Sequence, residues 1–287
     1  MPTYELAFIG GGNMAEAIAR GVLAAGVLAP SQMIVADPAE SRRTVFEKLA
    51  VAVSADNKQA AASAGRTLLA VKPQMMNAVL AELAPGISPN ILVISIAAGV
   101  STKRIEAGLA DNQSEIRPST SLRAGNPKSE IHVVRVMPNT PMLVGAGVSG
   151  LVKGAHATDA DLAWARRLFD AAGRTIVLGD EKLIDAVTAV SGSGPAYFFY
   201  LIEQLVAAGV AEGLNESDAL TLASQTAAGA AKLLAESNLP PAELRRRVTS
   251  PGGTTQAACE LLDSRNVAEA IRAAVRAAAN RSRELGQ

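Results

Sequence analysis

Short apolar runs alternate with helix-favouring segments along the first half of the chain. The run at residues 4–9 is followed by glycines and then by apolar residues at helical spacing over 14–25. Near-continuous apolar strands separated by helices are typical of a parallel sheet that is covered on both faces. The pattern therefore predicts an α/β domain with a doubly wound parallel sheet, whose further strands are expected at 33–36, 67–71, 91–95 and 132–136.

From about residue 180 the strand signals end and a helical period takes over. Alanine and other apolar residues recur at helical spacing through Leu285, with interruptions at 191–195, 240–241 and 250–253. The stretch 219–234 is apolar over more than one face, so this helix must be buried on several sides. Three or four helices form a small core, and we expect them to pack against a second copy of the chain. The pattern predicts two domains, 1–179 and 180–287, the second all-helical.

The segment 111–130 follows neither pattern. It is polar, contains Pro118, Gly125 and Pro127, and shows little periodicity. We expect a mobile surface loop there.

Composition and charge exclude several classes of function. The 287 residues include 27 basic and 27 acidic side chains, so there is no electrostatic footprint for a nucleic acid and no polybasic membrane patch. Cys259 is the single cysteine, which excludes an intramolecular disulfide and fits a reducing cytoplasm. The first residues lack a basic secretory region, and the uncharged stretch 83–102 contains Pro85 and Gly86. We therefore expect a soluble, cytoplasmic protein without a membrane span or a metal site.

A glycine-rich turn after the first strand is the clearest chemical motif. Gly10, Gly12 and Ala15 fit the pattern G-x-G-x-x-A at the start of a helix. Gly10 permits the tight turn, Gly12 lets the backbone touch a pyrophosphate, and Ala15 lets the helix pack close to the strand. The helix start offers unpaired N–H groups to the phosphates. The motif in this context predicts a dinucleotide site, and a tight turn without a ligand is the alternative.

The end of the second strand bears on which dinucleotide binds. A carboxylate at Asp37 would accept from the ribose 2′-hydroxyl, which favours NAD. Ser41, Arg42 and Arg43 follow one turn later and could cradle a 2′-phosphate, or form a solvated helix face. These residues leave both cofactors open.

Other strand ends carry small residues and prolines, at 70–73, 95–99 and 137–141. Ligands of doubly wound sheets bind at this edge. Small side chains at Ala97, Ala98 and Gly99 would let a nicotinamide ribose approach the backbone. For each segment taken alone, the alternative is an ordinary loop that ends a strand and binds no ligand.

Six motifs taken in order resemble one family. They are F-I-G-G-G-N-M-A at 8–15, A-V-K-P-Q at 70–74, S-I-A-A-G-V at 95–100, R-V-M-P-N-T-P at 135–141, D-A-V-T-A-V-S-G-S-G-P-A-Y at 185–197 and L-R-R-R-V-T-S-P-G-G-T-T at 244–255. Over nearly its whole length the chain resembles pyrroline-5-carboxylate reductase. The resemblance implies a Rossmann-like domain followed by a helical dimerisation domain. It also implies NAD(P)H-dependent reduction of 1-pyrroline-5-carboxylate to L-proline, the last step of proline biosynthesis.

The resemblance places the substrate carboxylate at the loop 250–255, before a helix expected at 256–262. Its glycines and hydroxyls suit an anion, although an ordinary N-cap is the alternative. Thr255 matches the family threonine proposed to hydrogen-bond the ring nitrogen, so it is expected to orient or protonate the imine, with a water relay as the other proton source. Glu181 matches a position near the bound product, with a solvated helix-start carboxylate as the alternative. The substrate residues implied are Glu181, Arg247, Ser250, Gly252, Gly253, Thr254 and Thr255.

The same residue matching implies the cofactor contacts. The adenosine and phosphate side would meet Asn57 and 70–73, and the nicotinamide half would lie along 96–98. We expect NADPH, with NADH as the alternative, and a homodimer that could join a ring of dimers, as the family often does. The segment 111–130 looks longer than the usual connection. The cofactor residues implied are Ile9, Gly10, Gly11, Gly12, Asn13, Met14, Asp37, Asn57, Ala70, Val71, Lys72, Pro73, Ile96, Ala97 and Ala98.

A β-hydroxyacid dehydrogenase is the closest competing function, because it has the same two-domain layout. In that class, a motif resembling G-x-G-x-x-x-K lies at the start of the helical domain, and its lysine is the acid–base catalyst. In this chain Gly192 and Gly194 match the two glycines, but Phe198 stands at the lysine position. An imine reductase for a larger ring and a cofactor-binding regulator without turnover are two further candidates. A regulator would have no reason to retain the loop 250–255.

Overall fold

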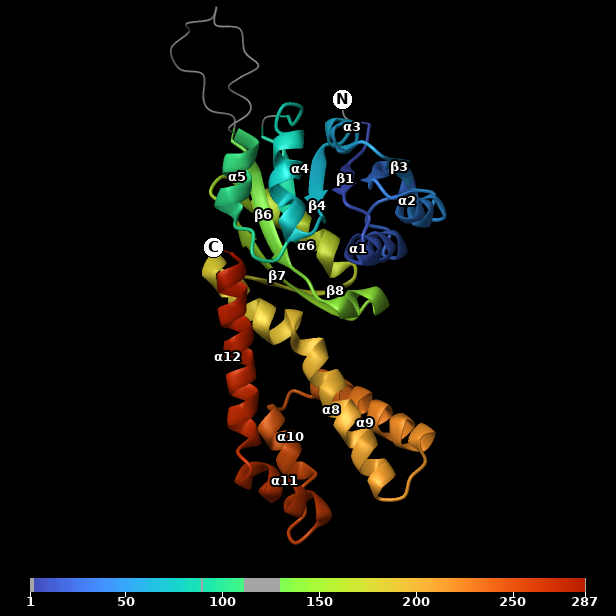
Figure 1. Cartoon of the computed structure of the whole chain (residues 1–287), viewed down its shortest axis with the longest axis vertical. Helices are drawn as coiled ribbons and strands as arrows, with labels where there is room; N and C mark the ends of the chain where they lie inside the picture. The colour runs from blue at the N-terminus through green and yellow to red at the C-terminus, as the bar shows by residue number, and fades with distance from the viewer. Residues whose placement is uncertain (1–2, 89, 111–129, 287) are drawn as a thin grey trace, which may run out of the picture. The chain divides into compact units, whose positions relative to one another are not determined.

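The structure, a computed structural model, describes residues 3–88, 90–110 and 130–286 (Figure 1). The loop expected at 111–130 therefore lies outside the described residues, apart from Glu130. The chain divides into two units, one of Met1–Gly192 with Ala279–Gln287 and the other of Ser193–Ala278.

The first unit is built on one eight-stranded sheet in the order β3-β2-β1-β4-β5-β6-β7-β8. All neighbouring strands pair in parallel except β6 and β7, which are antiparallel. The five strands expected from the sequence are all present. The strands are β1 (Leu6–Ile9), β2 (Met33–Ala36), β3 (Ala52–Ser54), β4 (Arg66–Leu69), β5 (Leu92–Ser95), β6 (His132–Met137), β7 (Gly147–Lys153) and β8 (Gly173–Val177).

Three strands were not expected, and each has a physical reason. β3 has only three residues, β7 carries Gly147 and Gly150, and β8 is largely exposed, so none forms a continuous apolar run. The five expected strands pair in parallel, as predicted, and the antiparallel pair β6–β7 involves a strand that was not expected. The connection 138–146 is shorter than the dozen or so residues that a parallel crossover needs.

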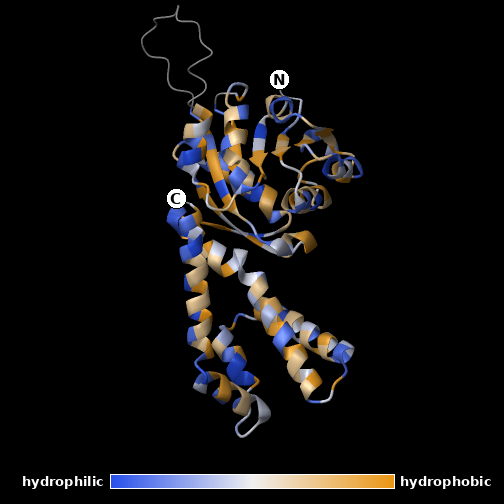
Figure 2. Ribbon diagram, viewed as in Figure 1, coloured by the Kyte–Doolittle hydropathy of each residue, from blue (hydrophilic) through white to orange (hydrophobic). Residues whose placement is uncertain are grey.

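Helices cover both faces of the sheet, as the apolar strands predict. Within β1, Leu6 and Phe8 pack into one core with α1 (Asn13–Ala24) and α6 (Asp159–Asp170). The alternate residues Ala7 and Ile9 pack into a second core with α3 (Asn57–Ala62), α4 (Met76–Leu83) and α5 (Thr102–Ala110). The helix α2 (Glu40–Glu47) adds Phe46 to the first core. Figure 2 shows the hydrophobic strands between more polar helices.

The rest of the described chain is helical. The second unit contains α8 (Gly194–Ala211), α9 (Glu216–Glu236), α10 (Pro241–Arg247) and α11 (Thr254–Ser264). α12 (Val267–Leu285) begins in the second unit and ends in the first, whereas the short α7 (Ile184–Val187) belongs to the first. Beyond the three or four helices expected, the structure adds α7 and α10, which are four and seven residues long.

Large apolar side chains of the second unit are exposed. On α8, Phe198 is 64%, Phe199 66% and Tyr200 66% exposed. Such a surface is unusual for a monomer and is typical of an interaction site. Within the described ranges, no helix is both long and apolar enough to cross a lipid bilayer.

A polar cluster holds the start of α6. The Thr158 N–H donates to Oδ2 of Asp161 at 2.8 Å, and the Asp161 N–H donates to Oγ1 of Thr158 at 3.1 Å. The same Asp161 oxygen lies 2.8 Å from Nδ1 of His132 in β6. Burial by itself would raise the pKa of Asp161, but hydrogen bonds from Thr158 and His132 outweigh it and hold that pKa below its ordinary value.

We expect Asp161→Ala to lower the free energy of unfolding by about 1–2 kcal/mol at neutral pH, because α6 loses a capping group. Because the pKa of Asp161 is lowered in the folded state, its carboxylate contributes fully to the free energy of unfolding above the ordinary carboxyl pKa. This contribution is lost as the pH falls through the lower, folded value. Urea unfolding of both proteins at neutral and acidic pH measures this, and a gap that does not shrink in acid would contradict it.

Candidate active site

The turn 10–12 brings two strands together through their backbones. Gly10 adopts a φ of +98°, and a Cβ there would lie 2.9 Å from the carbonyl oxygen of Ala70. Residues with a side chain rarely adopt this backbone conformation, so the turn requires glycine at this position. A Cβ on Gly12, by contrast, would meet nothing within 4 Å. The space beside Gly12 is open where the motif needs a phosphate to approach.

The start of α1 offers donors to that open space. Gly12 is the N-cap residue, with a φ of −68°, and no side chain caps the helix. The first N–H groups of a helix have no partner within it, and the helix dipole favours an anion at this end. The turn and the helix start therefore fit the pyrophosphate of a dinucleotide.

Asp37 locks the turn from the end of β2. Its Oδ2 accepts a hydrogen bond from the Gly11 N–H at 2.7 Å, and its Oδ1 accepts one from the Ala39 N–H at 2.9 Å. Both carboxylate oxygens therefore already have backbone donors. The side chain predicted to contact the ribose thus also holds the glycine turn against β2.

Two arginines of α2 are ordered at the same edge. Arg42 donates from Nε to the Gly11 carbonyl at 2.6 Å and from Nη2 to Glu16 at 2.9 Å. Arg43 donates from Nη1 to the Asp37 carbonyl at 2.8 Å. Burial by itself would raise the pKa of Glu16, but its bonds to Arg42 and Arg20 outweigh burial and keep this pKa below its ordinary value. Neither arginine is a freely solvated side chain, because Arg42 holds the glycine turn and Arg43 holds the backbone just after β2.

The other predicted cofactor residues lie at the carboxyl ends of neighbouring strands. Residues 70–73 follow β4, residues 96–98 follow β5, and Asn57 opens α3 after β3. The Ala70 N–H donates to the Ile9 carbonyl at 2.8 Å, which joins the ends of β1 and β4. The chain turns from one half of the sheet to the other between these two strands, where such folds bind dinucleotides. The structure thus brings the predicted residues to one edge, and their contacts with a cofactor stay a prediction.

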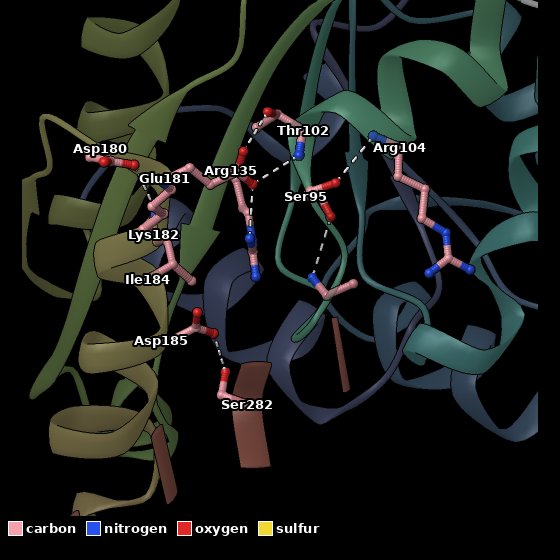
Figure 3. Close-up of polar contacts among 12 residues, drawn as sticks. Ser95, Thr102, Arg104, Arg135, Asp180, Glu181, Lys182, Ile184, Asp185 and Ser282 are labelled. Carbon is pink, nitrogen blue, oxygen red and sulfur yellow. Dashed lines mark hydrogen bonds and ion pairs between the residues drawn. The ribbon is translucent and has the colours of Figure 1, made fainter. Parts of the chain in front are cut away.

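Glu181 is held by three hydrogen bonds (Figure 3). Its Oε1 accepts from the Thr102 N–H at 2.9 Å and from Nη1 of Arg135 at 2.8 Å, and its Oε2 accepts from the Thr102 hydroxyl at 2.7 Å. The carboxylate therefore caps α5 and neutralises Arg135, whose side chain is only 8% exposed. Contact of Glu181 with substrate stays a prediction.

Sequence reasoning missed Arg135 and Thr102. A signal for Arg135 was available, because it interrupts the apolar run of β6. An arginine buried in a sheet needs a partner, since an unpaired charge is costly to remove from water. The identity of that partner could not be read from the sequence, because Glu181 lies 46 residues away.

The predicted carboxylate loop 250–255 precedes α11 in the second unit. The Gly252 N–H donates to Oε1 of Gln256 at 2.7 Å, and the Gly253 N–H donates to the Ser250 carbonyl at 3.0 Å. Both glycine N–H groups are therefore already bonded, one to Gln256 of α11 and the other within the loop. Gly253 is the N-cap of α11 and no side chain caps this helix. The donors suited to an anion are the first N–H groups of α11, which include those of Thr254 and Thr255.

Arg247 ends α10 just before this loop. It donates from Nε to Oε1 of Glu243 at 2.9 Å, and Arg246 donates to the same carboxylate. Hydrogen bonds from Arg246 and Arg247 hold the pKa of Glu243 below its ordinary value. In the described part of the chain, no three His, Cys, Asp or Glu side chains are placed to share a metal ion.

The sheet order and the uncapped glycine turn define a dinucleotide-binding domain of the Rossmann type. A family model described as "NADP oxidoreductase coenzyme F420-dependent" matches residues 5–99, which contain the turn. A second, described as "Pyrroline-5-carboxylate reductase dimerisation", matches residues 181–285. The protein is thus an NAD(P)H-dependent oxidoreductase with a dimerisation domain.

Relatives along the full chain identify the family. Pyrroline-5-carboxylate reductase of Pseudomonas aeruginosa is 43% identical over 288 residues, covering 100% of this chain and 98% of the relative. A solved structure of the Coxiella burnetii reductase has a TM-score of 0.88 at 37% identity, covering 99% of each chain. The Plasmodium falciparum reductase, solved with NADP bound, has a TM-score of 0.82 at 28% identity, covering 100% of each chain. The chain belongs to the pyrroline-5-carboxylate reductase family.

Gly12→Ala should separate folding from cofactor binding. The new methyl group meets no atom of the protein within 4 Å, so the melting temperature should stay within about 2 °C of wild type. It should nevertheless occupy the space that the pyrophosphate needs, and raise the Kd for NADPH about tenfold or more. Calorimetric titration and thermal unfolding measure the two quantities. Gly10→Ala is the contrasting variant and should lose stability as well. Unchanged NADPH affinity in Gly12→Ala would contradict the assigned phosphate position.

Proposed function

We propose that this protein reduces 1-pyrroline-5-carboxylate to L-proline with NADPH, the last step of proline biosynthesis. The observation that carries the proposal is a second uncapped, glycine-led helix start, that of α11, in a chain that already has the dinucleotide turn. One suits a pyrophosphate, and the other suits the carboxylate of a small substrate. Relatives named pyrroline-5-carboxylate reductase, matched over nearly their full length, support the same substrate.

The reaction asks the protein mainly for position and electrostatics. When bound, NADPH supplies a hydride from nicotinamide C4 to C5 of the protonated cyclic imine, and the π electrons of the C=N bond become the lone pair of the amine nitrogen. The first N–H groups of α11, together with the hydroxyls of Ser250 and Thr254, hold the substrate carboxylate. The hydroxyl of Thr255 orients the ring nitrogen. A threonine hydroxyl is a weak acid, so a relayed water is the source of the proton.

We assign the 2′-phosphate on the adenosine of NADPH to the end of β2. Both oxygens of Asp37 accept backbone N–H groups, and Arg43, with a nitrogen 2.8 Å from the Asp37 carbonyl, brings positive charge to that edge. Positive charge here favours NADPH, and NADH is the alternative cofactor. The remaining residues of the edge keep the roles given above, with Asn57 and 70–73 on the adenosine and phosphate side and 96–98 beside the nicotinamide.

We further propose that the protein works as a cytoplasmic homodimer, which could join a ring of dimers. The exposed apolar residues of α8 and the match to a dimerisation domain support a dimer. The functional division would be a cofactor domain, 1–179, and a dimerisation and substrate domain, 180–287. The dimerisation match at 181–285 supports that boundary, although residues up to Gly192 and from Ala279 onward pack with the sheet.

The direct test is oxidation of NADPH with pyrroline-5-carboxylate as the hydride acceptor. The reaction is followed by the loss of the reduced nicotinamide absorbance at about 340 nm. Wild type should turn over, and NADPH should support a higher kcat/KM than NADH. Thr255→Ala should lower kcat about a hundredfold, because the ring nitrogen loses the hydroxyl that orients it for hydride transfer. The Kd for NADPH should change less than about twofold, because Thr255 acts on the substrate.

Two variants serve as controls for this prediction. Thr255→Ser keeps the hydroxyl and should retain most of the activity. Thr221→Ala removes an exposed hydroxyl of α9 that bonds only its own helix at the Ser217 carbonyl, and it should behave as wild type. Folded wild-type protein that oxidises neither nucleotide with this substrate would refute the proposed function. A Thr255→Ala enzyme with wild-type kcat would refute the role of the hydroxyl alone.

A further inference from the structure

Three segments far apart in the sequence meet in the first unit. They are residues 96–102, which form the loop between β5 and α5 with the first residue of that helix, the turn 181–187 that includes α7, and the end of α12, residues 282–286. Figure 3 shows two of their contacts, at Glu181 and at Ser282. Each segment touches the other two, so the three form a closed set.

The end of α12 touches the loop through the backbone. Gly99 has a φ of +72°, and a Cβ there would lie 2.9 Å from the carbonyl oxygen of Leu285 and 3.3 Å from the nitrogen of Gly286. Only a residue without a side chain fits between the two segments. Gly99 therefore marks a close approach that any shift of the helix end would change.

The end of α12 is also bonded to the turn. The Ser282 hydroxyl donates to Oδ1 of Asp185 at 2.6 Å, and Ser282 is only 5% exposed. This bond is partly buried, and hydrogen bonds to charged acceptors are among the stronger ones in a protein. It fixes where α12 ends relative to the turn.

The turn 181–187 is also bonded to the first segment, 96–102. Glu181 accepts from the N–H and the hydroxyl of Thr102, the first residue of α5, while Arg135 holds the same carboxylate from β6. Inside the loop, the Ala97 N–H reaches Oγ of Ser95 only at 3.3 Å, beyond the usual range for such a bond. At its start the loop is bonded from outside, because the Ile96 N–H donates to the Leu69 carbonyl of β4 at 3.1 Å.

We propose that the end of α12 and the turn 181–187 form a clamp that positions residues 96–98 for the nicotinamide half of the cofactor. Ser282, Asp185, Glu181 and Gly99 are positioning residues in this clamp. The inference rests on the proposed function, because residues 96–98 are there placed beside the nicotinamide. α12 begins in the second unit, and its end from Ala279 onward, which forms the clamp, belongs to the first.

Ser282→Ala tests the clamp with two probes of the cofactor site. NADPH carries the nicotinamide, and adenosine 2′,5′-bisphosphate carries only the adenosine half. The variant should bind NADPH about fivefold more weakly, the effect of losing one partly buried hydrogen bond. Its affinity for the bisphosphate should change less than about twofold, because the clamp lies away from that half. Amide hydrogen exchange in residues 96–102 of the free protein should become faster.

Matched variants separate the clamp from general damage. Ser282→Thr keeps the hydroxyl and should bind NADPH as wild type does. Ser264→Ala removes a hydroxyl that bonds only the Leu261 carbonyl and should change neither ligand. Gly99→Ala should weaken NADPH selectively. Gly26→Ala has a similar φ of +64° but no atom within 4 Å of the new methyl group, so it controls for the strain of a left-handed alanine.

The outcomes distinguish the clamp from the proposed function. Selective loss of NADPH affinity in Ser282→Ala, with faster exchange in the loop, supports the clamp. Equal loss of both ligands would mean that Ser282 only stabilises the fold, and no loss of either would mean that the bond does not position the loop. Either result would overturn the clamp. A wild-type protein that binds NADPH but does not reduce pyrroline-5-carboxylate would instead overturn the proposed function.

Discussion

The close backbone approach between Gly10 and Ala70 is the constraint on which the rest of the structure depends. It joins β1 to the end of β4 at the point where the chain changes from one half of the sheet to the other. It also sets where α1 begins, and so where the unpaired N–H groups point. Asp37 and Arg42 bond the Gly11 backbone from the other side. The glycine turn is therefore held by neighbouring segments without any ligand, which would lower the entropic cost of binding a phosphate there.

The two proposed ligand sites would use similar chemistry on different frameworks. Both α1 and α11 begin at a glycine without a side-chain cap. A protein with as many acidic as basic side chains can hold two anionic ligands in this way, because the helix starts supply donors without net charge. In the loop 250–255 the glycine N–H groups are already bonded. The glycines there shape the loop, and the donors come from the helix itself.

Local patterns carried much of the fold and part of the site. The five apolar strands, the glycine turn and the helical second half could all be predicted, because each leaves a period or a motif in neighbouring residues. The strands β3, β7 and β8 could not, because they are short, rich in glycine or exposed. The cluster of Glu181, Thr102 and Arg135 depends on tertiary contacts between residues 46 and 79 positions apart. Only the charge within an apolar strand hinted that Arg135 needed a partner.

Direct transfer of hydride to the substrate is the central claim, and isotope labelling tests it most directly. The protein would be incubated with pyrroline-5-carboxylate and NADPH deuterated at both C4 positions, and the product analysed by mass spectrometry and NMR. Hydride transfer to the cyclic iminium predicts L-proline with a single deuterium at C5. Unlabelled proline, or no proline from folded protein that binds NADPH, would contradict it.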